Sequence, residues 1–175
     1  MNISKYVLLT SVGVSLLFLA GCGQKLPPGM PKLYQTTITI MQDGKPLAGA
    51  AVNVVNDDFA TNPWTAGGIT DANGVISLKT EGQYLGVPAG KYSVSVRKTE
   101  GPEGLELPKN PSSDEEIREY DRIMKQIQEN SFHVVDDQFM DAKNSPLKLE
   151  VKGTTKETFD VSPAVKNKVV LGPSA

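Results

Sequence analysis

The stretch GGITDANGVISLK, residues 67–79, permits two incompatible interpretations. Its centre, TDANG (70–74), resembles part of a calcium-binding EF-hand loop, and it also resembles a tight turn between two β-strands. An EF-hand loop with Gly74 at its sixth position puts Ile69 at the first position and Thr80 at the twelfth, where oxygen ligands are required. The residues after the turn alternate between apolar and polar with the period of a strand. The motif therefore predicts a hairpin turn rather than a calcium site.

Further segments on both sides of this turn show the same alternation, which is typical of half-buried strands. Turn residues such as Asp43-Gly44 separate them. Short alternating segments with turns between them predict an all-β fold, specifically an antiparallel β-sandwich. The segments are 36–41, 50–55, 69–70, 75–80, 92–97, 147–152 and the residues around 159–161.

One segment breaks this pattern, because SSDEEIREYDRIMKQIQEN (112–130) has helical periodicity. Ser113 and Glu116 form a capping box, so we expect a helix over about 113–130. Its apolar residues share one face: Ile117, Tyr120, Ile123, Met124 and Ile127. We expect this face to lie against the sandwich. The alternatives are a helix that binds a partner or lies on a membrane, and the mixed charges of the polar face count against the membrane.

The N-terminus combines an apolar run after Lys5 with the sequence Leu19-Ala20-Gly21-Cys22, which resembles the lipobox of bacterial lipoproteins. We expect a signal peptide helix over 1–21 and lipidation of Cys22, the single cysteine of the chain. The alternatives are an ordinary secretory signal or one anchoring helix. Residues 22–32 then form the lipidated N-terminus and a flexible, extended tether rich in proline and glycine.

Three motifs together carry a resemblance to a known family: DGKPLAGA (43–50), TDANG (70–74) and PAGKY (88–92). With the later stretch 141–149, they resemble the carboxypeptidase regulatory-like, transthyretin-like domains found in small bacterial lipoproteins. The resemblance implies a seven-stranded antiparallel sandwich over 33–163 and a non-catalytic role. It also implies that 101–140 is a helical insertion and that 164–175 is a C-terminal tail.

Composition limits the function further. The formal net charge of −2 gives no reason to expect a nucleic-acid partner. The length suits one domain after removal of the signal peptide. Lipidation predicts a membrane-anchored protein of the cell envelope that faces the periplasm or the exterior. The outer membrane is expected if the cell is Gram-negative, because Gly23 follows Cys22.

The sequence contains no motif of a zinc hydrolase or of a serine or cysteine hydrolase. His133 is the only histidine, so neither a zinc hydrolase site nor a Ser-His triad can be assembled. The acidic pairs Asp57-Asp58 and Asp136-Asp137 would form a cation site only if they met in space, and we interpret them as surface acids. We therefore expect no enzyme activity, no cofactor and no metal.

The remaining hypothesis is a binding or structural module. Its candidate surfaces are the 101–140 insertion and the loop at 56–66, which carries Trp64, the single tryptophan. An exposed aromatic ring can anchor a protein partner or stack on a sugar. The leading prediction is an envelope protein as partner. The alternative is a carbohydrate- or cell-wall-binding module that uses Trp64, Phe59 and Tyr84.

Overall fold

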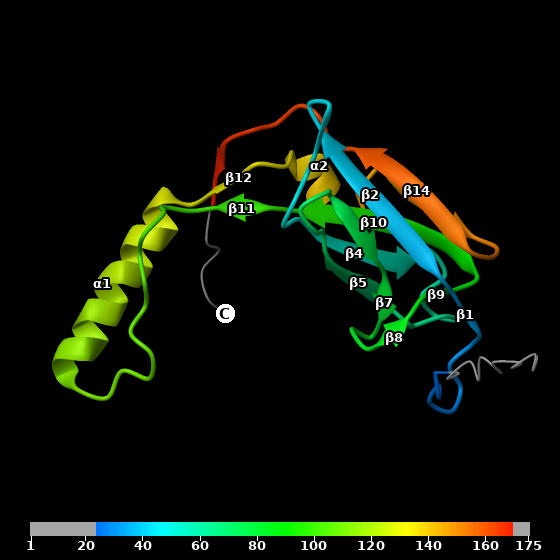
Figure 1. The fold of residues 1–175 in the computed structure, drawn as a ribbon, viewed down its shortest axis with the longest axis horizontal. Helices are drawn as coiled ribbons and strands as arrows, with labels where there is room; N and C mark the ends of the chain where they lie inside the picture. Colours follow the sequence, from blue (N-terminus) through cyan, green and yellow to red (C-terminus); the bar gives the residue numbers. More distant parts are fainter. Residues whose placement is uncertain (1–23, 170–175) are drawn as a thin grey trace, which may run out of the picture.

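The computed structural model describes residues 24–169. Two sheets with one shared hydrophobic core dominate it, and a helical arm projects from one end (Figure 1). The fold is mostly β, as the alternating segments predict. The strands are β1 (Leu33–Tyr34), β2 (Thr36–Gln42), β3 (Lys45–Pro46), β4 (Ala51–Asn56), β5 (Ala66–Ile69), β6 (Val75–Ser77), β7 (Lys79–Thr80), β8 (Tyr84–Leu85), β9 (Val87–Pro88), β10 (Gly90–Arg97), β11 (Thr99–Glu100), β12 (Phe132–His133), β13 (Lys148–Val151), β14 (Thr155–Asp160) and β15 (Asn167–Lys168). The helices are α1 (Asp114–Asn130) and α2 (Asp137–Met140).

The larger sheet has six strands in the order β13-β10-β4-β5-β7-β8, and the four-stranded sheet is built around β2. Strand β2 pairs with β14 on one side and with β3 and β6 on the other. The pairing of β14 with β2 is parallel, from Thr155 beside Thr36 to Asp160 beside Met41. The prediction of a wholly antiparallel arrangement is therefore wrong at this pair. Alternation of apolar residues predicts a strand but not its direction.

Alternating residues of both sheets fill the core. In β2 every second residue from Thr36 to Gln42 is buried, and in β10 Tyr92, Val94 and Val96 are fully buried. Their apolar neighbours across the sheet are buried too: Val52, Val54 and Leu149. The short helix α2 closes one end of this core, where Phe139 is buried.

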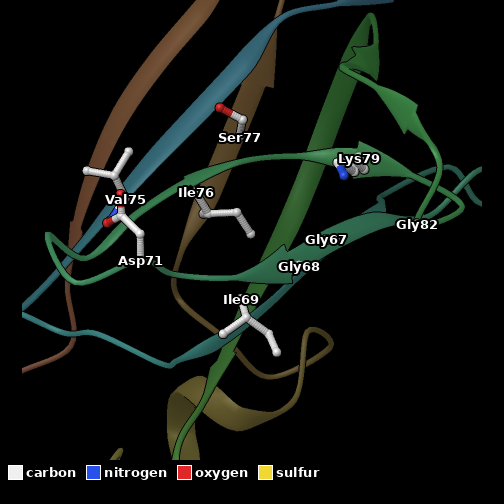
Figure 2. Close-up of a pocket in the computed structure, with 9 residues that line it drawn as sticks. All are labelled: Gly67, Gly68, Ile69, Asp71, Val75, Ile76, Ser77, Lys79 and Gly82. Carbon is white, nitrogen blue, oxygen red and sulfur yellow. The ribbon is translucent and has the colours of Figure 1, made fainter.

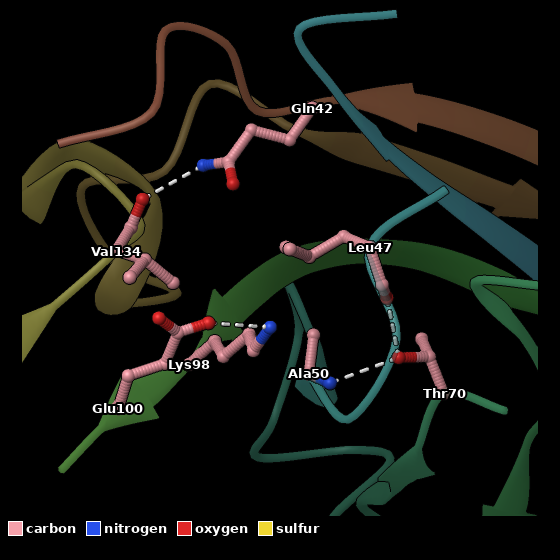
Figure 3. Close-up of polar contacts among 7 residues, drawn as sticks. All are labelled: Gln42, Leu47, Ala50, Thr70, Lys98, Glu100 and Val134. Carbon is pink, nitrogen blue, oxygen red and sulfur yellow. Dashed lines mark hydrogen bonds and ion pairs between the residues drawn. The ribbon is translucent and has the colours of Figure 1, made fainter. Parts of the chain in front are cut away.

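Buried polar groups connect elements at the arm end of the sheets (Figure 3). The hydroxyl of Thr70 accepts a hydrogen bond from the backbone N–H of Ala50 (2.9 Å) and donates one to the carbonyl of Leu47 (2.7 Å). The side-chain amide of Gln42 donates to the carbonyl of Val134 (2.7 Å). Each bond satisfies a group that would be costly to bury alone. Nearby, Lys98 and Glu100 form an ion pair at 2.9 Å.

The turn at 70–74 forms as predicted. The Asp71 carboxylate accepts hydrogen bonds from the N–H groups of Asn73 (2.8 Å) and Val75 (2.9 Å), and Gly74 has a φ of +68°. The flanking strands, however, do not pair with each other. Strand β5 pairs with β4 and β7 in the larger sheet, whereas β6 pairs with β2 in the other. The turn therefore carries the chain from one sheet to the other, and the hairpin interpretation is wrong in this respect.

The helix begins and ends almost as predicted, over Asp114–Asn130 with the capping box of Ser113 and Glu116. Its position differs from the expectation. Figure 1 shows α1 projecting away from the sheets, with the segment 101–111 running back beside it. Ile123 is its only buried residue, and Ile117 is 45% exposed. The expectation that the apolar face lies on the sandwich is therefore wrong. Residues 101–131 are called the arm below.

The segment expected to be a C-terminal tail, 164–175, instead contacts the folded body over its described part, 164–169. Val165 donates a backbone hydrogen bond to Val134, and β15 pairs with β12, so residues 164–169 join a small three-stranded sheet at the base of the arm. At the other terminus, β1 pairs with β9. The sheets thus have a proximal end, near the first described residues, and a distal end, which bears the arm (Figure 1).

Candidate functional site

Cys22 and the signal peptide of 1–21 lie outside the described residues. The tether that follows is described from Gln24, and it contacts the proximal end. The side-chain carbonyl of Gln24 accepts a hydrogen bond from the backbone N–H of Leu85 (2.8 Å). The N–H of Met30 bonds to the carbonyl of Pro27 (3.2 Å), and the Met30 side chain is buried. Residues 24–32 therefore turn back onto the domain, whereas the sequence predicts an extended spacer.

The loop between β4 and β5 lies at the same end and carries the predicted aromatic surface. The backbone N–H of Asp57 donates to the carbonyl of Lys91 (2.9 Å), and the Thr65 N–H donates to the Glu81 carboxylate (3.1 Å). In the middle of the loop, the Asn62 amide donates to the Tyr92 hydroxyl at 3.3 Å. These three contacts hold the loop against the proximal end of the larger sheet.

Tyr92 is the interior anchor of this loop. Its hydroxyl donates to the carbonyl of Pro88 (2.8 Å), and its ring is fully buried in β10. Burial raises the pKa of Tyr92, against the smaller opposing effect of the Asn56 and Asn62 side chains. The hydroxyl therefore stays protonated and donates the hydrogen bond to Pro88.

The three predicted aromatic residues do not share one surface cavity. Phe59 is 52% exposed, whereas Trp64 and Tyr84 are partly buried. Phe59 lines a cavity of about 490 Å³, and neither Trp64 nor Tyr84 is part of its wall. The other lining residues are Val55, Asn56, Asp57, Ser93, Ala142 and Lys143. The structure thus separates Phe59 from the other two rings.

A polar network lies beside this cavity. The Lys148 ammonium donates to the Ser93 hydroxyl (2.6 Å), which donates to the Asp57 carboxylate (2.6 Å). Ser93 and Lys148 are cross-strand neighbours in β10 and β13, and Asp57 follows the end of β4. Such a chain offers donors and acceptors to a polar ligand. Sequence reasoning missed it, since the three residues meet only through the register of separate strands.

The single histidine and the two acidic pairs are dispersed over the fold. His133 lies in β12 at the base of the arm, where its Nδ1 is 3.0 Å from the Thr99 hydroxyl. Asp57 lies beside the start of β10, and Asp136 caps α2, whose Met140 carbonyl accepts a hydrogen bond from Arg97 at the end of β10. The two acidic pairs are therefore at opposite ends of one strand. Across residues 24–169, no group of three or more His, Cys, Asp and Glu side chains is close enough to hold a metal ion.

A second cavity, of about 500 Å³, lies beside the turn at 70–74, where the chain passes from one sheet to the other (Figure 2). Residues of β5, β6 and β7 line it, including Gly67, Gly68 and Lys79. At Gly67 an added Cβ would lie 2.4 Å from the Val52 carbonyl oxygen, so only glycine fits this close approach. The carboxylate of Asp71 is already bonded to its own turn. Ser77 and Lys79 supply the other polar side chains of the lining.

The arm offers a different kind of surface. Segment 101–111 runs beside α1 (Figure 1). Ile117 remains exposed, and Tyr120 and Met124 are only partly buried. These three residues recur at spacings of three and four, so they form one strip on the helix. In the described part of the chain, neither helix is long and apolar enough to cross a bilayer.

Comparison with known proteins adds little to this geometry. No family model matches the chain. No curated protein matches it either. Among solved structures, a 9R-lipoxygenase from Cyanothece PCC8801 aligns with a TM-score of 0.32 and 15% sequence identity. That alignment takes in 79% of this chain but only 18% of the lipoxygenase chain, and a likeness of this size carries no argument about fold or function.

Proposed function

We propose that this protein is a lipid-anchored, non-catalytic binding module of the cell envelope, built on a transthyretin-like sandwich. Lipid on Cys22 holds the proximal end at a membrane, and the arm at the distal end binds an envelope protein. The lipobox-like LAGC at 19–22 supports the anchor, and the motifs at 43–50, 70–74 and 88–92 support the family.

The observation that carries the binding role is the incompletely covered apolar strip of α1. The arm projects from the body (Figure 1). Its apolar strip consists of Ile117, which is 45% exposed, and of the partly buried Tyr120 and Met124. Exposed apolar surface rimmed by charge is typical of a protein–protein contact. Its position opposite the chain's first described residues directs it away from an anchored membrane.

A photo-crosslinking amino acid at Ile117 tests this role in living cells. The control carries the same group at Gln126, which faces the opposite side of α1 because nine residues span two and a half turns. We expect a discrete protein adduct from position 117 and none from position 126. Equal adducts at both positions, or none at either, would remove the arm as the binding surface.

A carbohydrate- or cell-wall-binding function is the second candidate, and the Phe59 cavity favours it. An exposed ring there adjoins the hydrogen-bonding chain of Asp57, Ser93 and Lys148, a combination suited to a sugar face and its hydroxyl groups. Glycan-array binding that disappears in Phe59→Ala but persists in Trp64→Ala would support this function. Absence of binding by the unaltered protein would exclude it.

A further inference from the structure

We propose that the proximal end lies directly against the lipid headgroups, with β8 as its contact, so that the domain rests on the bilayer. This inference rests on the proposed lipidation of Cys22. It goes beyond that anchor because it assigns an orientation to the domain and a membrane-contact role to Leu85. The occupant of this surface is therefore a phospholipid bilayer.

The first argument is the short path from the lipidated residue to β8. The hydrogen bond between the Gln24 side chain and the Leu85 N–H fixes residue 24 beside β8. Cys22 precedes Gln24 by two residues, and two extended residues span at most about 7 Å. The acyl chains therefore enter the bilayer close to β8, at the end of the sheets where β1 pairs with β9.

The second argument is that the proline-rich segment adds no distance between domain and membrane. It turns at Gly29, which has a φ of +83°, and the adjacent Met30 is buried. The chain then enters β1, which pairs with β9. Residues 24–34 are thus held at both ends by the segment 84–88.

Gly86 explains why β1 can approach so closely. A Cβ at this position would lie 2.7 Å from the carbonyl oxygen of Tyr34, and the φ of +107° also favours glycine. The close contact of β1 with the β8–β9 segment therefore requires the glycine at position 86. It does not depend on the single hydrogen bond of Gln24.

The exposed side chains of this region suit a headgroup layer. Leu85 is 46% exposed, although it lies in a paired strand. Lys25 and Lys32 are exposed on the adjacent segment, and the Lys32 ammonium lies 5.2 Å from the centre of the Tyr34 ring. An apolar side chain with lysines and a tyrosine on the neighbouring segment is the composition found where proteins meet anionic headgroups.

Lipid quenching of a single fluorophore tests this orientation. Because the thiol of Cys22 carries lipid, a Leu85→Cys protein can be labelled at the introduced thiol alone. The matched control is Ile117→Cys on the arm, since Ile117 is 45% exposed and Leu85 is 46% exposed. Both lipidated proteins are reconstituted into vesicles of phosphatidylethanolamine and phosphatidylglycerol, with a spin label near the headgroup of a fraction of the lipids.

We expect the fluorophore at position 85 to lose most of its emission and the fluorophore at 117 to keep it. Full emission from both positions in protein that floats with the vesicles would overturn the orientation and leave the anchor intact. Failure of the unaltered protein to incorporate a fatty-acid label and to float would instead defeat the anchor itself. Shielding of position 85 from an aqueous quencher without lipid quenching would assign this end to a protein contact and overturn the proposal.

Discussion

At the scale of single residues, Tyr92 connects the core to the proximal loop. Its ring is fully buried, and its hydroxyl bonds to Pro88 and Asn62. A Tyr92→Phe substitution keeps the ring but leaves a buried carbonyl without its donor. We expect the free energy of unfolding to fall by about 1–2 kcal/mol. Urea denaturation measures this, with Tyr120→Phe on the arm as a control that should change little.

Glu116 gives the clearest dependence on pH. Its carboxylate accepts hydrogen bonds from the N–H groups of Ser112 (2.9 Å) and Ser113 (3.0 Å) and from the Ser112 hydroxyl, and these bonds lower its pKa from 4.5 to about 2. Because the pKa is depressed in the folded helix, the cap is fully present above about pH 4.5. It is lost as the pH falls through about 2.

We therefore expect α1 to fray at its first turn between those two pH values. An NMR titration of the Glu116 carboxyl measures the pKa, and far-ultraviolet circular dichroism follows the helix. A Glu116→Ala protein should show reduced helicity already at neutral pH. Glu115→Ala, in the same turn, is the control and should retain the transition. A carboxyl pKa near 4.5 at Glu116 would contradict the cap.

Residues in short sequence patterns could be predicted, and residues that meet through tertiary structure could not. Ser113 and Glu116 are three residues apart, so the local sequence predicts their capping box, and the structure confirms it. Ser93 and Lys148 are 55 residues apart and become neighbours only through the pairing of β10 with β13. Exposure of a ring is equally non-local, which explains why Phe59 and Trp64 differ.

At the scale of elements, the turn at 70–74 shows how local chemistry can be right while the pairing is wrong. Asp71 and Gly74 form the same hydrogen-bonded turn whether the flanking strands pair together or separate. The separation follows from β2, whose edge accepts β6 through Ile38 beside Ile76. Nothing in the local sequence of 67–79 indicates that β6 pairs with β2. The parallel pairing of β14 is hidden for the same reason.

Gly74 joins this turn to β2, which makes it more sensitive than an ordinary turn glycine. A Cβ at Gly74 would lie 2.6 Å from the Ile40 carbonyl oxygen, whereas a Cβ at Gly44 meets nothing within 4 Å. Both have similar φ values, +68° and +74°. An alanine at either site incurs about 1–2 kcal/mol of backbone strain, and at Gly74 the displacement of β2 adds about 1–3 kcal/mol.

Equilibrium unfolding of Gly74→Ala and Gly44→Ala therefore isolates the close approach, because backbone strain is common to both proteins. We expect Gly74→Ala to be the less stable of the two. Equal losses of stability would show that the turn does not press against β2. The comparison needs no assumption about the absolute stability of the unaltered protein.

At the scale of the whole molecule, the arm and the proximal end are separated by the length of β10. Strand β10 runs from Gly90 at the proximal end to Arg97, and β11 leads directly into the arm. The sequence predicted the helix but not its direction, since an apolar face does not specify what covers it. Here the segment that runs beside α1 is 101–111 of the arm itself, and the sheets lie apart from the helix (Figure 1).

The arm should be removable without loss of the body. The main hydrophobic core contains no residue between Val96 and Val134, apart from Phe132 packed at its border. Strands β11 and β12 pair antiparallel, with Glu100 beside Phe132, so the arm is an insertion between adjacent strand ends. Replacing residues 102–130 with a short Gly/Ser turn shortens the connection between β11 and β12. A shorter connection lowers the entropy cost of closing the loop on folding. We expect the urea midpoint of the body to be unchanged or slightly higher.

The same shortened protein separates the two proposed functions of the molecule's ends. It should still incorporate a fatty-acid label and float with vesicles, since Cys22 and residues 24–34 are intact. It should lose the envelope protein captured through position 117, because the strip of Ile117, Tyr120 and Met124 is gone. Retention of that partner in a pull-down with the shortened protein would move the binding surface to the body, where the Phe59 cavity is the next candidate. Unfolding of the shortened protein would show that the body depends on the arm.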